Sequence, residues 1–217
     1  MGFYDVLSPE RLALYLVADP DQTSGDFLAA VEAAMDGGVT AVQIRVKHGG
    51  VRRAYELALD VQKRCEWRGI PFLVNDSLGV ALASNADGIH IGVNDLPLIA
   101  IRTLISPTFA VGYSPETDEQ TIQARSAGAD YLGLGPVFVT GSKADAGAAI
   151  GLEILSRRAR LSDLPTVAIG GITLDNASAV MESGVVGIAV MSAILRAADP
   201  RDAAQRLIEV VRYARQT

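Results

Sequence analysis

Eight short apolar runs alternate along the whole chain with segments that carry apolar residues at helical spacing. This alternation predicts parallel strands, each followed by a helix that covers the sheet. The runs begin at Leu12, Ala41, Pro71, Gly88, Phe109, Tyr131, Thr166 and Val186. A weak internal repeat supports the count, because a turn of small residues precedes the run in 37–44, 85–91, 127–134 and 183–190, at every second strand.

The architecture that closes eight such units is the α/β fold known as the (β/α)8 TIM barrel, and we expect a single domain over residues 1–217. The alternative is a doubly wound open sheet, which normally carries a G-x-G-x-x-G loop after its first strand. Here the first run leads into ADPDQTSGD at 18–26, so the barrel is favoured. The helices after the third and fourth runs are expected to be short.

Composition excludes several classes of protein. The net charge of −6 argues against general binding of nucleic acids, and no stretch of 18 apolar residues predicts a membrane span. The single cysteine, Cys65, has the spacing of a core residue, and two histidines with one cysteine make a structural zinc site improbable. We expect a cytoplasmic protein, and a symmetric homodimer is the oligomer that we consider.

The second run has the most informative side chains. In 42–47 apolar residues alternate with Gln43, Arg45 and Lys47, so the three polar side chains share one face of the expected strand. Two neighbouring cations repel each other unless an anion lies between them, which predicts a clamp for phosphate. The alternative is an edge strand with one face in solvent.

Carboxylates follow the third and fourth runs, where Asn75 and Asp76 end one strand and Asp95 follows the next. Two carboxylates opposite cations suit Mg²⁺ bound to a diphosphate, because Mg²⁺ takes few protein ligands and completes its octahedron with phosphate and water. Each aspartate could instead cap the helix that follows it. His90 is expected to make a structural hydrogen bond inside the barrel and to bind no metal.

The loop after the sixth run is long, and Thr140, Gly141, Ser142 and Lys143 occur in it together. Hydroxyl groups, a glycine and an ammonium group in one long loop predict a lid that closes on phosphate.

A second phosphate site is expected after the seventh and eighth runs, where Gly170, Gly171, Met191 and Ser192 occur. Loops at these two positions are the recurrent phosphate site of this fold. Ser114, which ends the fifth run, lacks the G-x-S-x-G elbow of a hydrolase nucleophile. Two facing anion sites suggest a transferase that joins two phosphorylated molecules.

The chain resembles the thiamine-phosphate synthase family along its whole length. VQIRVK is similar to the family's Q-[IL]-R-x-K strand, and VNDSLGVALASNADGIHIGVNDLP to its N-D and H-[LIV]-G-x-x-D-L-P stretch. VGYS, GPVFVTGSKADA, AIGGI and VMSAI match the remaining motifs in order.

The resemblance implies the Mg²⁺-dependent condensation of 4-amino-2-methyl-5-(diphosphooxymethyl)pyrimidine with a thiazole phosphate, giving thiamine phosphate and pyrophosphate. It implies that the pyrimidine diphosphate is held by Gln43, Arg45, Lys47, Asn75, Ser114 and Lys143. It assigns Mg²⁺ to Asp76 and Asp95, and the thiazole phosphate to Thr140, Ser142, Gly171, Met191 and Ser192. Among these residues, Arg45, Lys47 and Lys143 are the expected catalytic cations.

Val46, Val93, Asn94 and Val139 depart from the family pattern, and the ADAGAAIG stretch has less proline than usual. By strand parity Val46 points away from the barrel mouth, so these departures concern rate and loop order more than reaction type. Two other functions stay open at this point. One is a related thiazole tautomerase, and the other is a non-catalytic barrel that binds phosphates of the thiamine pathway.

Overall fold

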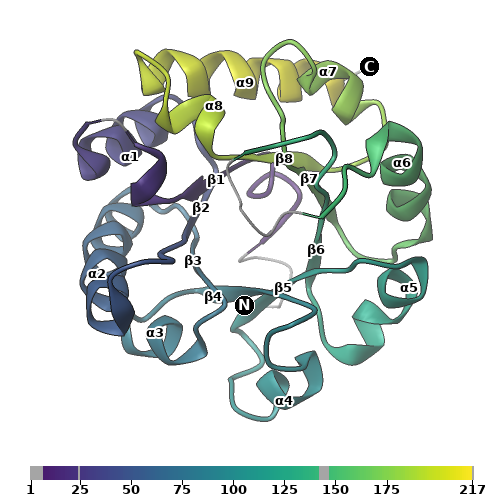
Figure 1. Cartoon of the computed structure of the whole chain (residues 1–217), viewed down its shortest axis with the longest axis horizontal. Helices are drawn as coiled ribbons and strands as arrows, with labels where there is room; N and C mark the ends of the chain where they lie inside the picture. The colour runs from purple at the N-terminus through teal and green to yellow at the C-terminus, as the bar shows by residue number, and fades with distance from the viewer. Residues whose placement is uncertain (1–6, 24, 142–146, 217) are drawn as a thin grey trace.

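The computed structural model describes residues 7–23, 25–141 and 147–216, which form a closed barrel of eight parallel strands. The strands pair in chain order, and the eighth pairs with the first to close the barrel (Figure 1). Their bounds are Leu14–Ala18 (β1), Ala41–Ile44 (β2), Phe72–Asn75 (β3), Gly88–Gly92 (β4), Ala110–Ser114 (β5), Tyr131–Leu134 (β6), Thr166–Ile169 (β7) and Gly187–Val190 (β8). The predicted TIM barrel is confirmed and the open doubly wound sheet is excluded; the extent of the domain, 1–217, stays a prediction.

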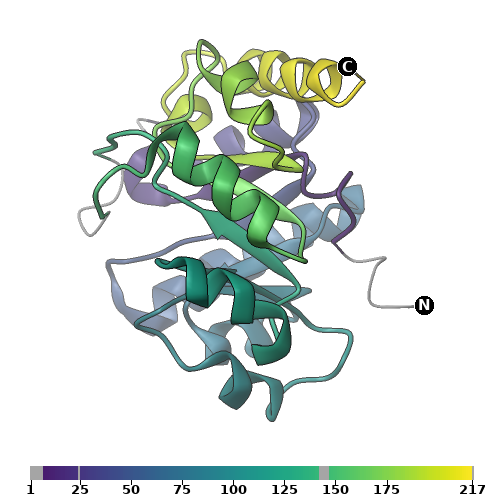
Figure 2. The same ribbon diagram turned by 90° about the vertical axis from the view of Figure 1, so that its right-hand side faces the viewer.

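Helices cover the outside of the barrel, as Figures 1 and 2 show. In the described residues they are η1 (Pro20–Gln22), α1 (Phe27–Asp36), α2 (Gly50–Arg68), α3 (Leu78–Ala83), α4 (Leu98–Arg102), α5 (Asp118–Ala127), α6 (Gly151–Leu161), α7 (Ala177–Met181), α8 (Ser192–Leu195) and α9 (Pro200–Ala214). The two helices predicted to be short, α3 and α4, have six and five residues. None of the helices in the described ranges is long and apolar enough to cross a membrane.

The strands are buried on both faces, which is why they read as apolar runs in the sequence. One face of each strand packs against the helices, and the other fills the barrel interior. Cys65 lies on α2 in this core, where burial raises the pKa of its thiol to about 12. Its predicted role in packing is therefore confirmed.

The second strand ends earlier than its apolar run. β2 stops at Ile44, so Arg45 and Lys47 lie in the loop between β2 and α2. The alternation nevertheless continues, because the amide of Arg45 donates to the Ala18 carbonyl of β1 at 2.9 Å. Val46 packs against the core as parity predicts. The polar side chains of this segment therefore lie at the end of the barrel that is formed by the carboxyl ends of the strands.

Candidate active site

A cavity of about 610 Å³ opens at the carboxyl ends of the strands. Parallel strands in a barrel bring these ends together, and active sites of this fold form there. The predicted site residues that line it are Arg45, Lys47, Asn75, Asp76, Asp95, Ser114, Thr140, Gly171, Met191 and Ser192. Residues from seven loops or strand ends, distant in the sequence, therefore meet at one mouth.

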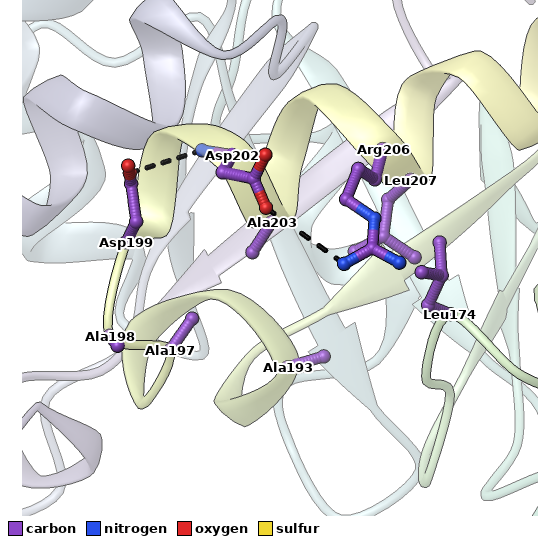
Figure 3. A pocket seen from close by; sticks show the side chains of 9 residues that line it. All are labelled: Leu174, Ala193, Ala197, Ala198, Asp199, Asp202, Ala203, Arg206 and Leu207. Atoms are coloured by element: carbon purple, nitrogen blue, oxygen red, sulfur yellow. Dashed lines mark hydrogen bonds and ion pairs between the residues drawn. The ribbon is translucent and has the colours of Figure 1, made fainter.

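A second hollow of about 360 Å³ lies between α8 and α9, on the outside of the barrel (Figure 3). Its walls are mainly alanine and leucine, with Asp199, Asp202 and Arg206 as the charged groups. Asp199 accepts from the amides of Arg201 and Asp202 as the cap of α9, and Asp202 lies 3.9 Å from Arg206. These groups serve the helix itself, so the mouth is the candidate active site.

Both cations of the second strand segment face carboxylates at the mouth. Arg45 Nη1 lies 2.5 Å from Asp19 Oδ2, and both side chains are more than nine-tenths buried. Lys47 Nζ lies 2.7 Å from Asp76 Oδ2 in a half-exposed pair. The two positive charges are thus each offset by an acid, which makes their close approach tolerable. Because β2 pairs with both β1 and β3, the edge-strand alternative is wrong.

Asp76 and Asp95 are not helix caps. Ser77 caps α3 through the amide of Val80, and α4 begins after Pro97 without any side-chain cap. Asp95 Oδ2 instead accepts from the amide of Gly92 at 2.7 Å and closes the turn after β4. Both aspartates therefore keep carboxylate oxygens for the mouth, and the capping alternatives are wrong.

The carboxylate of Asp76 lies close enough to that of Asp95 to affect its pKa. Burial raises the pKa of Asp95, and the neighbouring carboxylate of Asp76 adds to the rise, while the Gly92 amide and Lys47 act in the opposite direction. Asp76 also has a φ of 62°, a left-handed conformation that costs energy for a residue with a Cβ. The chain thus holds two acids together at a position where packing does not require them.

This pair of acids fits Mg²⁺. A divalent cation would offset both the burial and the repulsion from Asp76 that raise the pKa of Asp95, and Mg²⁺ needs only one or two protein carboxylates. A cage of three or more histidine, cysteine or acidic ligands is not found in the described part of the chain. The donor set therefore suits a metal that shares its coordination with phosphate and water.

The amide and hydroxyl groups of the site are linked through the barrel interior. Gln43 is buried and donates to Asn75 Oδ1 at 3.2 Å. His90 Nε2 lies 2.8 Å from Ser114 Oγ, and His90 Nδ1 lies 2.9 Å from the hydroxyl of Tyr131. The structural hydrogen bond predicted for His90 is thus present.

The loops after β6, β7 and β8 close the other side of the mouth. Gly170 and Gly171 have φ values of 99° and 67°, and a Cβ on Gly171 would lie 2.7 Å from that of Phe138. These glycines allow the β7 loop to approach the β6 loop closely. Thr140 lines the cavity, Gly141 is exposed outside its lining, and Ser142 and Lys143 lie outside the described residues.

Three charged residues at or beside the mouth were missed by the sequence analysis, namely Asp19, Glu116 and Arg158. Asp19, the partner of Arg45, directly follows the first apolar run, and its position at a strand end was the signal that could have found it. Arg158 on α6 lines the cavity and pairs with Asp118 at 3.1 Å. Arg158 lies in the middle of a helix, so a search of the residues at strand ends does not find it.

Comparison with known proteins decides the family. The profile of the family described as thiamine monophosphate synthase matches residues 14–194, which span all eight strands. The chain belongs to this family. The resemblance predicted from the motifs is therefore confirmed.

Individual members of the thiamine monophosphate synthase family match nearly the whole chain. The thiamine-phosphate synthase of Desulfitobacterium hafniense (strain Y51) is 44% identical over 201 residues, which cover 92% of this chain and 97% of that protein. The Moorella thermoacetica protein of the same name is 46% identical over 188 residues, or 87% of this chain and 90% of the relative. The structure of thiamine phosphate pyrophosphorylase from Pyrococcus furiosus has a TM-score of 0.86 at 35% identity and covers 95% of this chain and 98% of its own.

Proposed function

We propose that this chain is a transferase that condenses 4-amino-2-methyl-5-(diphosphooxymethyl)pyrimidine with a thiazole phosphate to give thiamine phosphate and pyrophosphate. Membership of the thiamine monophosphate synthase family confirms this predicted function at the level of the reaction. The observation that carries it for these residues is the convergence of Lys47, Asp76 and Asp95 at one mouth. Paired acids beside a cation suit a metal diphosphate and have no role in packing.

The pyrimidine diphosphate would occupy the side of the mouth formed by the loops after β2, β3 and β4. Lys47 would exchange part of its pairing with Asp76 for the diphosphate, while Asp76 and Asp95 hold Mg²⁺. When bound, Mg²⁺ neutralises charge on the diphosphate as it becomes a leaving group. Arg45 would bind the phosphate through two hydrogen bonds of its buried guanidinium group, and Lys143, which follows β6 in the sequence, would contribute a further positive charge.

The reaction then needs little from general bases. The C–O bond to the diphosphate breaks with its electron pair leaving on oxygen, and the electron-rich aminopyrimidine stabilises the methylene cation. The cations of the site stabilise the charge that grows on the departing diphosphate. The ring nitrogen of the thiazole donates its lone pair to the cation and forms the new C–N bond. Holding both partners in one cavity removes most of the entropy cost of bringing them together.

The thiazole phosphate would be bound by the loops after β6, β7 and β8. Thr140, Gly171, Met191 and Ser192 line that side of the cavity, and Ser142 belongs to the same β6 loop. The backbone turns at Gly170 and Gly171 present amides at a place where phosphate is often held in this fold. We further propose a cytoplasmic location and a homodimer, on the sequence arguments given above.

The experiment mixes the purified protein with both phosphorylated precursors and Mg²⁺ and measures pyrophosphate and thiamine phosphate. We expect both products in equal amounts, and none when either precursor or Mg²⁺ is omitted. A tautomerase would change only the thiazole partner, and a binding barrel would release no pyrophosphate. Either of these results would contradict the proposed function. The family match does not favour these two alternatives.

A further inference from the structure

Six polar side chains form one continuous hydrogen-bonded chain through the barrel interior. In order along this chain they are Asn75, Gln43, Tyr15, Tyr131, His90 and Ser114. Every link measures between 2.8 and 3.2 Å. The six residues come one each from β1 to β6, and both ends of the chain, Asn75 and Ser114, line the candidate active site. We call this set the interior chain.

The barrel is shaped around the interior chain. A Cβ on Gly112 of β5 would lie 2.2 Å from the Tyr131 ring and 2.3 Å from His90 Nδ1. A Cβ on Gly133 of β6 would lie 3.0 Å from the His90 ring. Glycine in the interior of a strand weakens that strand. Two glycines beside these rings therefore indicate that the rings need the volume that a Cβ would occupy. Tyr15 and Tyr131 are 2% and 1% exposed, and their rings are tilted with centroids 6.0 Å apart.

The direction of the hydrogen bonds follows from counting protons. Burial raises the pKa of both tyrosines, so each hydroxyl keeps one proton to donate. Gln43 Oε1 can only accept, so Tyr15 donates to it and must accept from Tyr131. The only hydroxyl proton of Tyr131 is then used in the hydrogen bond to Tyr15, so His90 Nδ1 donates a hydrogen bond to the Tyr131 oxygen. A neutral His90 with the proton on Nδ1 accepts at Nε2, so Ser114 must donate to it.

With Gln43 Oε1 toward Tyr15 and a neutral His90, the counting determines what the two ends offer a ligand. Ser114 has spent its proton inside the barrel, so its hydroxyl can only accept a further hydrogen bond. Asn75 accepts from Gln43 through Oδ1, so its amide hydrogens remain as donors. If the Gln43 amide were turned over, every bond of the interior chain would reverse and so would both ends.

We propose that Tyr15, Tyr131 and His90 are positioning residues that set the hydrogen-bond polarity of Ser114 and Asn75. This makes the site specific for a heterocycle that donates a hydrogen bond to the Ser114 hydroxyl and accepts one from the Asn75 side-chain amide. The inference rests on the proposed function, in which the heterocycle is an aminopyrimidine. Its exocyclic amine is a donor and its ring nitrogens are acceptors, whereas the 4-oxo analogue presents a carbonyl acceptor where the amine stood.

The first test needs no substrate. The chain has two histidines, so the ¹⁵N shifts of His90 can be assigned by comparison with a His48→Gln variant, which changes an exposed residue. At neutral pH we expect His90 to carry its proton on Nδ1 and none on Nε2. In Tyr131→Phe the proton is expected to move to Nε2, because Nδ1 has lost the oxygen to which it donates. A proton on Nε2 in the unmodified protein, as the other tautomer or as imidazolium, would overturn the proposal.

The second test measures selectivity, as the ratio of kcat/KM for the amino substrate to that for its 4-oxo analogue. A site that hydrogen-bonds its substrate rejects a mismatched analogue strongly, so we expect a ratio of about 100 or more in the unmodified protein. Tyr131→Phe and Tyr15→Phe should each lower this ratio at least tenfold. The control is Tyr113→Phe, the same change on the opposite face of β5, where the ratio should stay constant.

An unchanged ratio in a folded Tyr131→Phe or Tyr15→Phe variant would contradict the proposal, as would an equal fall in Tyr113→Phe. Failure of the proposed function is recognised separately, because the unmodified protein would then form no thiamine phosphate. In that case the tautomer of His90 still decides whether the interior chain runs in the stated direction.

Discussion

The buried ion pair between Asp19 and Arg45 offers the sharpest test of how the site is held together. Asp19→Asn keeps an oxygen that can accept from the Asp21 amide, as Asp19 Oδ1 does at 3.0 Å, and it replaces the charged oxygen that accepts from Arg45 by an uncharged NH2 group. The pair has a separation of 2.5 Å, and its side chains are 2% and 8% exposed, so water cannot replace the lost carboxylate. We therefore expect the variant to be much less stable.

The size of the effect can be worked out from this burial. Removing one member of a buried ion pair typically costs about 3–5 kcal/mol, because the other charge stays buried. For a chain of 217 residues, 1 kcal/mol corresponds to about 2–4 °C in Tm, so Tm should fall by roughly 6–20 °C. The assay is thermal and urea unfolding followed by circular dichroism. The double variant Asp19→Asn/Arg45→Met, which removes both charges, should recover at least half of the loss.

The matched control is the exposed pair of Asp202 and Arg206 on α9, which are 3.9 Å apart and about 60% exposed. Asp202→Asn should cost less than about 1 kcal/mol, since solvent screens this pair. A loss below that size for Asp19→Asn as well would show that the buried pair does not stabilise the site, as would a double variant that is no more stable than the single one.

Three further changes have definite expected outcomes. Asp76→Asn should lower kcat by about a hundredfold or more with an unchanged far-UV spectrum, because it removes a proposed Mg²⁺ ligand; near-normal turnover would remove that assignment. Gly112→Ala should cost about 1–3 kcal/mol in urea unfolding, since its Cβ would lie 2.2 Å from the Tyr131 ring; unchanged stability would show that the ring can move aside. The Cys65 thiol, with its pKa raised to about 12, stays protonated at pH 8, so a thiol reagent should label it only after unfolding; rapid labelling of the native protein would contradict its burial.

Much of the fold was predictable because the barrel strands are buried on both faces. Such strands appear as apolar runs, and the predicted starts at Ala41, Gly88 and Thr166 are those observed for β2, β4 and β7. The end of β2 was not predictable, since Arg45 and Val46 continue the alternation beyond Ile44, the last residue of the strand. Alternation reports which way side chains point, and it does not report which residues the neighbouring strands still reach.

The sequence predicts those site residues that lie at the ends of strands. Asp76, Asp95 and Ser114 all follow or end apolar runs, and all of them line the cavity. The pairing of Arg45 with Asp19 could not be derived, because it depends on β1 and β2 lying side by side in a particular register. Contacts of this kind are set by tertiary geometry, which composition and spacing do not encode.

The interior chain shows the same limit more clearly. Tyr15 and Tyr131 have the spacing of ordinary core residues, and nothing local distinguishes them from the leucines beside them. Their hydroxyls matter only because β1 and β6 face each other across the barrel interior, where the two oxygens meet at 2.9 Å. A polar link between opposite strands of a barrel leaves no periodic trace in the sequence.

Binding of a metal diphosphate by the loops after β2, β3 and β4 can be observed in crystals grown with pyrophosphate and Mn²⁺. Mn²⁺ replaces Mg²⁺ and is located by its anomalous scattering. We expect a single strong peak in contact with carboxylate oxygens of both Asp76 and Asp95, with pyrophosphate oxygens bound to Lys47 and Arg45. A Mn²⁺ peak elsewhere on the molecule, or pyrophosphate bound away from these two cations, would contradict this expectation.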